Sequence, residues 1–196
     1  MANLTKIFGT FYLVLFLSGC LSIGSGQLTN LISVPSGQTN IKYKLPNGFC
    51  LDISANSETA FQKTMVVTNC IAVSNRNKSY LSRRPVDTIV NITFTKPRVP
   101  KDISQEKYLS LVSEKMEFKQ LLVASSNKKI VYGEKKLRKN FFQLSFERIS
   151  SSNRREFVRK YFFLVDNKLV VMTILSFQKP RKNTYVAFEG FIKKLS

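Results

Sequence analysis

Two consecutive segments near the end of the chain, residues 157–165 and 169–177, are apolar on both of their alternating faces. Asp166-Asn167 separates them, and this pair tolerates positive φ and suits a tight β-hairpin turn. A strand that is apolar on both faces needs cover on both sides of its sheet. We therefore expect this hairpin in the centre of a sheet that is buried on both faces.

The remaining segments predict an α+β domain at residues 41–196, with an antiparallel sheet of six or seven strands. One helix is expected from Asp102 or Ser104 through Lys115, and a C-terminal helix is expected after Asn183. Residues 75–85 are expected as an exposed loop, whereas residues 116–123 fit either a helix or a strand. Further strands are expected at residues 49–53, 64–73, 88–95, 129–132 and 142–147. The apolar face of the C-terminal helix is expected to contain Tyr185, Phe188, Ile192 and Leu195.

The N-terminus has the pattern of a bacterial lipoprotein signal peptide. Residues 7–17 form a mostly apolar run of eleven, which is shorter than the roughly 20 residues of a transmembrane helix and fits a signal-peptide core. Leu17-Ser18-Gly19-Cys20 then resembles the lipobox of bacterial lipoproteins. The resemblance implies cleavage after residue 19, lipidation of Cys20, and stable anchoring by two or three acyl chains. The alternative is an ordinary signal peptide in which Cys20 is incidental.

The resemblance also implies an address in the bacterial envelope, with the protein facing the periplasm. Leu21, rather than Asp, follows the cysteine, which favours the outer over the inner membrane. Residues 21–40 are uncharged and rich in small polar side chains, so residues 20–40 are expected to form a flexible tether with a reach of roughly 25 Å.

Removing Cys20 from the count leaves Cys50 and Cys70, in a compartment where disulfides persist. A bridge between them is the leading expectation, and two buried free thiols are the alternative. The loop of 21 residues would contribute about 3 kcal/mol in the chain-entropy model.

Two further resemblances concern the folded part. The order of its elements, with a late hairpin leading into a C-terminal helix, resembles the PsbP-like α/β/α sandwich. The segment Leu45-Pro46-Asn47-Gly48-Phe49-Cys50, followed twenty residues later by a second cysteine, resembles uncharacterised lipoproteins of alphaproteobacteria. Neither resemblance implies a catalytic residue.

The chain is strongly basic, with 31 Lys and Arg against 12 Asp and Glu and a net charge of +19. Between residues 128 and 160 there are eleven basic residues and three acids. An anionic lipid surface or an acidic envelope protein is therefore an expected partner. The alternative is a solvated surface that only keeps the domain soluble, and the envelope address makes nucleic acid an improbable partner. The expected contact residues are Lys135, Lys136, Arg138, Lys139, Arg154 and Arg155.

The composition leaves little room for catalysis. The chain has no His, which excludes Ser-His-Asp and Cys-His catalysis and His-ligated metals. No cofactor or metal is expected, because a disulfide would consume the thiols and no calcium-binding loop occurs. We expect a non-enzymatic envelope lipoprotein. The alternative is a cell-wall glycan hydrolase that uses a carboxylate pair, Glu147 with either Glu156 or Asp166.

Overall fold

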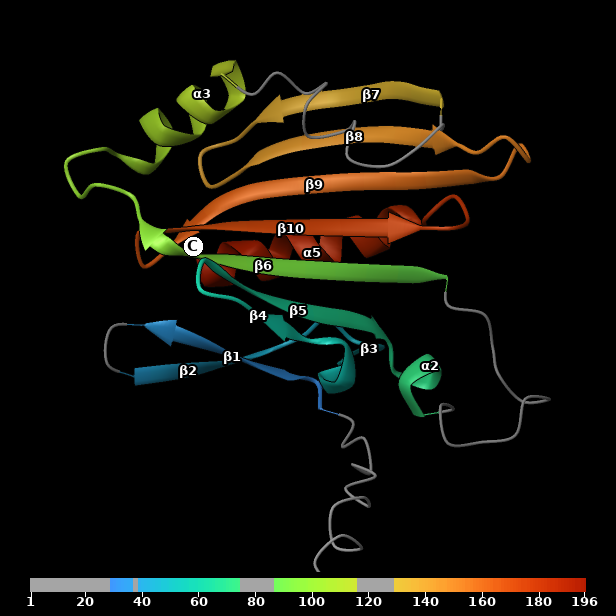
Figure 1. Ribbon diagram of the computed structural model, residues 1–196, viewed down its shortest axis with the longest axis horizontal. Coiled ribbons are helices and arrows are strands. Elements are labelled where there is room, and N and C mark those ends of the chain that lie inside the picture. The colour runs from blue at the N-terminus through green and yellow to red at the C-terminus, as the bar shows by residue number, and fades with distance from the viewer. Residues whose placement is uncertain (1–28, 37–38, 75–86, 116–128) are drawn as a thin grey trace, which may run out of the picture.

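The computed structural model describes residues 29–36, 39–74, 87–115 and 129–196 (Figure 1). The predicted signal peptide with Cys20, the predicted loop at 75–85 and the undecided stretch 116–123 lie outside these ranges. Within them, no helix is long and apolar enough to cross a membrane.

An antiparallel sheet of eight strands dominates the molecule, and a separate two-stranded sheet lies beside it. Along the large sheet the order is β3-β5-β6-β10-β9-β8-β7, with β4 paired to β5 (Figure 1). The small sheet consists of β1 (Leu31–Ser36) and β2 (Thr39–Lys44). The other strands are β3 (Phe49–Leu51), β4 (Ser57–Glu58), β5 (Gln62–Asn69), β6 (Thr88–Arg98), β7 (Lys129–Leu137), β8 (Phe142–Ile149), β9 (Arg155–Val165) and β10 (Lys168–Ser176). The helices are η1 (Ile53–Ala55), α2 (Cys70–Ser74), α3 (Gln105–Lys115) and α5 (Lys182–Leu195).

The hairpin β9–β10 lies in the centre of the sheet, as its apolar faces predict. Asp166 and Asn167 have φ values of 48° and 54°, which confirms the expected two-residue turn. Tyr161 and Phe163 point to one face of β9, whereas Phe162 points to the other, and all three are fully or almost fully buried.

Helix α5 covers one face of the sheet and lies behind β10 and β6 in Figure 1. Phe188, Phe191, Ile192 and Leu195 are buried in the main core, against side chains such as Ile92. Burying each of these side chains contributes about 2 kcal/mol. The expected C-terminal helix is therefore confirmed, but it begins at Lys182 rather than after Asn183, and Phe191 joins its predicted apolar face.

Helix α3 packs on the opposite face, where Leu109 contacts Phe142 and Phe162. The Ser104 hydroxyl accepts a hydrogen bond from the Lys107 amide at 3.3 Å, as an N-terminal cap does. Of the two expected starting residues, Ser104 is therefore the one that caps the helix.

The expectation of an α+β sandwich with six or seven strands is wrong. The fold is β-rich, with eight strands in the main sheet and two more in the small one. The tether predicted for residues 20–40 is also wrong where the structure describes it, because residues 31–36 and 39–44 pair as β1 and β2. Ile32 and Val34 of β1 are 0% and 1% exposed. The stretch around them, residues 21–40, is uncharged and rich in small polar side chains, so composition favoured a linker over a strand.

The structure joins Cys50 of β3 to Cys70, the first residue of α2, with a Cα–Cα distance of 4.8 Å. Strand β3 pairs with β5 over only three residues, so the bridge fastens a short edge strand to the segment that follows β5. Gly48, in the turn before β3, has a φ of 84°, which favours glycine. Its carbonyl accepts the Cys70 amide at 2.9 Å.

Candidate functional site

The six basic residues predicted to form one contact surface do not lie together. Lys135 and Lys136 are neighbours on β7 and point to opposite faces of the sheet, since successive side chains alternate along a strand. Arg138 and Lys139 follow in the turn to β8, whereas Arg154 and Arg155 lie at the start of β9, where Arg155 pairs with Ile149 at the other end of β8. A strand of eight residues spans about 25 Å. The exposed pairs Arg138–Lys139 and Arg154–Arg155 therefore lie at opposite ends of β8, and the six residues do not share one place.

Three of the six also have partners within the domain. The Lys135 ammonium donates to the Ser113 carbonyl of α3 at 2.7 Å. Lys136 forms an ion pair with Glu134, and Arg155 lies 3.8 Å from the Glu147 carboxylate. Contact of the six residues with an anionic surface stays a prediction, but they do not form one docking face.

The turn between β7 and β8 lies against the end of α5. The Asn140 side-chain amide donates to the Ser196 hydroxyl at 3.1 Å, and the Gln105 amide donates to the Asn140 carbonyl at 3.1 Å. The exposed side chains of Arg138 and Lys139 are therefore next to the last turn of α5. Lys193 and Lys194, in the last turn of α5, therefore lie near these two cations of the β7–β8 turn.

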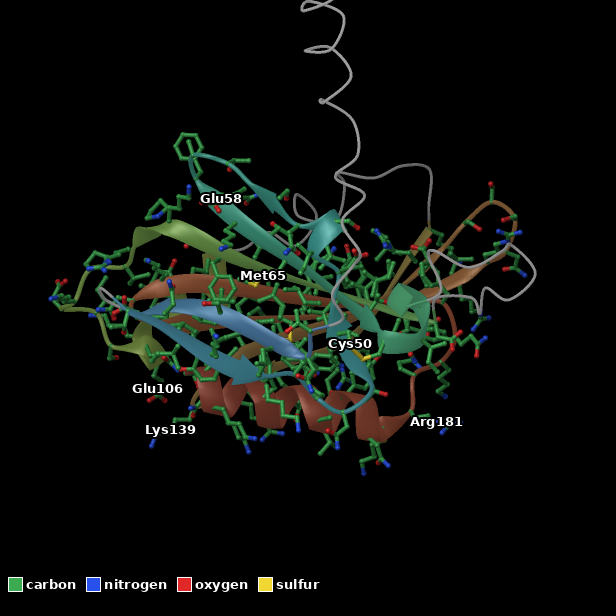
Figure 2. All side chains as sticks on the ribbon, turned by 90° about the horizontal axis from the view of Figure 1, so that it is seen from below. Cys50, Glu58, Met65, Glu106, Lys139 and Arg181 are labelled. Carbon is green, nitrogen blue, oxygen red and sulfur yellow. A yellow bond between two sulfur atoms is a disulfide. The ribbon has the colours of Figure 1, made fainter. Side chains whose placement is uncertain are left out.

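The solvent-facing side of α5 is basic at both ends and apolar in the middle. We call it the α5 face, and it consists of the exposed residues Lys182, Val186, Ala187, Gly190, Lys193 and Lys194. Figure 2 shows α5 along one side of the molecule, with Arg181 and Lys139 beyond its two ends. Glu58 lies on the opposite side in the same view. The sequence contained a signal for this face, because its residues occupy the helical positions that the predicted apolar stripe leaves free.

A cluster of polar side chains connects α5 to β9 beneath the helix. The Arg159 guanidinium lies 3.7 Å from the centre of the Tyr185 ring and 3.7 Å from the Glu189 carboxylate. The buried Tyr161 hydroxyl donates to the same Glu189 oxygen at 3.1 Å. Burial raises the pKa of both Tyr161 and Tyr185 above its ordinary value, so both phenols are neutral at physiological pH.

A pocket of about 240 Å³ opens beside this cluster, between the β7–β9 part of the sheet and the start of α5. Phe157, which shares a sheet face with Arg159, and Tyr185 contribute aromatic walls, and Arg159 and Lys179 contribute positive charge. Glu147 is the one carboxylate among its described lining residues. The pocket therefore offers no pair of carboxylates for acid–base catalysis.

The carboxylate pairs considered for glycan cleavage are not brought together. Glu147 and Glu156 lie on neighbouring strands but point to opposite faces of the sheet, and Glu156 forms an ion pair with Arg148 at 2.9 Å. Asp166 lies in the turn at the far end of β9, 3.5 Å from Arg98. The described residues also contain no group of three His, Cys, Asp or Glu side chains that could hold a metal ion.

No family model matches the chain, and no curated protein matches it. Among solved structures, the chain is similar to the extracellular domain of PknH from Mycobacterium tuberculosis, with a TM-score of 0.40 and 7% sequence identity. The similarity covers 74% of this chain and 66% of that one, so the chain spans just under two thirds of the length of that neighbour. A likeness of this size assigns neither a family nor an activity.

Proposed function

We propose that the protein is a non-enzymatic lipoprotein of the bacterial envelope, whose basic domain contacts an anionic surface. Lipidation at Cys20 would hold it on the periplasmic side of a membrane, with the outer membrane favoured over the inner. The lipobox supports the anchor, and the Cys50–Cys70 disulfide fits an oxidising compartment.

The observation that carries the proposal is uncompensated positive charge on the surface. Lys6 is the only charged side chain before Lys42, so residues 42–196 carry a net charge of +18. Six described carboxylates already have Lys or Arg partners, and most of the other cations in the described part of the chain are exposed. Each Lys or Arg near an anionic membrane contributes roughly 1 kcal/mol of attraction.

The hydrolase alternative loses its structural basis, because Glu147, Glu156 and Asp166 do not converge. An acidic envelope protein has the same charge complementarity as a lipid surface. Cross-linking in intact cells, followed by mass spectrometry of the captured proteins, distinguishes an acidic protein partner from a lipid surface.

The proposal is tested in two arms. For the anchor, Cys20→Ala should leave the protein unprocessed or release it from the membrane fraction. Mature Cys20→Ala protein at wild-type levels in that fraction would contradict the anchor. For the contact, a soluble chain of residues 27–196 contains every residue that the structure describes. It should sediment with anionic vesicles and not with neutral ones, and failure to bind anionic vesicles would contradict the proposed contact.

A further inference from the structure

We infer that the α5 face is the surface through which the domain docks on an anionic phospholipid bilayer. The inference rests on the proposed function, because it names the orientation that the proposed contact takes. Of the six contact residues expected from the sequence, it keeps Arg138 and Lys139 beside the last turn of α5 and replaces the other four with residues of α5 and its start.

The shape of the α5 face suits a flat surface. Lys182 and Lys193 are eleven residues apart, which is about 16 Å along a helix. Between them, Val186 is 56% exposed, and Ala187 and Gly190 are small. A helix with small apolar residues in the middle and lysines at both ends can lie along a bilayer while its ammonium groups reach the headgroups.

The acidic and basic side chains of α5 lie on different sides of the helix. Glu189 is the only acid between residues 182 and 195, and it points inward to the Tyr161 hydroxyl and the Arg159 guanidinium. The outward side therefore carries Lys182, Lys193 and Lys194 without a carboxylate on the same helix face.

Neighbouring segments extend the positive charge at both ends. Arg181 precedes α5, and Arg138 and Lys139 lie beside its last turn, next to the Asn140–Ser196 hydrogen bond. Two acids lie in the same surroundings. Asp87 lines a pocket with Arg181, and Glu106 is the second residue of α3, next to Gln105, which contacts Asn140. Neither acid forms an ion pair with a described cation of this region, so the balance is six cations against two acids.

The expected anchor can reach this side of the molecule. Cys20 lies nine residues before Thr29, so the intervening chain spans at most about 30 Å. Thr29 forms a bridge with Leu51 of β3, and the ring of Phe49 in the same strand lies 4.9 Å from that of Phe188 in α5. The chain therefore enters the domain next to the helix that carries the docking face.

The test uses the full-length protein, reconstituted into vesicles of phosphatidylcholine alone or of phosphatidylcholine with phosphatidylglycerol. Lysines are acetylated for short times, and mass spectrometry gives the rate at each position. We expect Lys182, Lys193 and Lys194 to react about tenfold more slowly on anionic than on neutral vesicles. Lys63 and Lys96 are the internal control and should react equally on both. Lys96 pairs with Glu58 at 3.0 Å, on the side opposite α5 in Figure 2.

Two variants with equal loss of charge provide the matched comparison. Lys193→Gln/Lys194→Gln should weaken docking about thirtyfold, measured as lost protection of Lys182. Lys63→Gln/Lys96→Gln should leave the protection of Lys182 unchanged.

The outcomes separate the inference from the proposed function. Equal protection of all five lysines on anionic vesicles would overturn the α5 face while the anionic contact stands, as would protection only at Lys63 and Lys96. If no lysine distinguishes anionic from neutral vesicles, both the docking face and the proposed contact fail.

Discussion

The Arg159 guanidinium of β9 stacks on the Tyr185 ring of α5, with 3.7 Å between Cζ and the ring centre. The same guanidinium attracts Glu189, so one side chain of the sheet holds two residues that lie one helical turn apart on α5. This contact fixes how the helix is rotated. It directs the only carboxylate of α5 toward the sheet and its lysines toward solvent.

Arg159→Met keeps much of the side-chain volume and removes the charge. We expect the free energy of unfolding to fall by about 2 kcal/mol, because the cation–π contact is lost and Glu189 loses its cation. Urea unfolding measures the change. Arg154→Met, at an exposed residue without an ion pair to a described carboxylate, is the control and should change stability by less than about 0.5 kcal/mol. Equal effects of the two variants would show that the cluster does not hold α5.

Tyr161→Phe removes only the hydroxyl that donates to Glu189. Tyr161 is fully buried, and a hydrogen bond to a charged group is worth about 1.5 kcal/mol or more, so the variant should unfold at lower urea. In the Arg159→Met background the same change should have a different effect, since residues of one network are not additive. Additive losses in this double-mutant cycle would argue against a coupled cluster.

Lys160 of β9 points to the face of the sheet that α3 partly covers. Burial lowers the pKa of its ammonium, and the charge of Arg148 lowers it further. The folded state therefore disfavours the protonated form that is present at neutral pH, and Lys160→Met should raise the unfolding temperature. Because the folded pKa lies below the unfolded one, this penalty disappears as the pH rises through the folded pKa toward about 10.

The gain from Lys160→Met should accordingly shrink between neutral pH and pH of about 10. Lys129→Met, at an exposed position, serves as the control and should show little change at either pH. A Lys160→Met variant that is less stable than the wild type at neutral pH would refute the assignment of a desolvation penalty.

Cys50→Ala/Cys70→Ala should lower the free energy of unfolding by about 3 kcal/mol, since the bridge closes a loop of 21 residues in the unfolded chain. A reducing agent should destabilise the wild type to a similar degree and leave the double variant unaffected. The expectation fails if the wild type unfolds at the same denaturant concentration with and without reductant.

The elements that sequence predicts well are those whose pattern is strong over many residues. The hairpin of β9 and β10 has apolar residues on both faces and a turn pair with positive φ, and α5 has four apolar residues at helical spacing. Strand β1 has Ile32 and Val34 as buried alternating positions among the four residues whose burial the structure describes, in a stretch without charge. That pattern is too short to be distinguished from a linker.

Gly133 shows a second limit of sequence patterns. A glycine after a short apolar run predicted that the strand would end there, yet β7 continues to Leu137 through a register shift between Tyr132 and Lys135. A Cβ at position 133 would lie 3.0 Å from both the carbonyl and the hydroxyl oxygen of Ser145. The glycine is needed for close approach of two strands, which sequence alone does not distinguish from a strand end.

The candidate surface was predictable in its charge and not in its position. The basic residues described between 129 and 160 are distributed over both faces of strands β7 to β9 and over both ends of these strands. Residues that are close in sequence therefore do not form one surface. The lysines of α5 are fewer, but their positions along the helix place them on one side of it. Their role depends on contacts of Glu189 and Asn140 with residues 28 or more positions away, which a local pattern does not contain.

The central claim is that positive charge holds the domain on an anionic surface. Its most direct test is the affinity of residues 27–196 for phosphatidylglycerol-containing vesicles from about 0.01 M to about 1 M NaCl, over which the Debye length falls from roughly 30 Å to 3 Å. The account predicts a steep and continuous loss of affinity with added salt, and negligible binding to neutral vesicles throughout. An affinity that does not change with salt, or an absence of binding at the lowest salt, would contradict it.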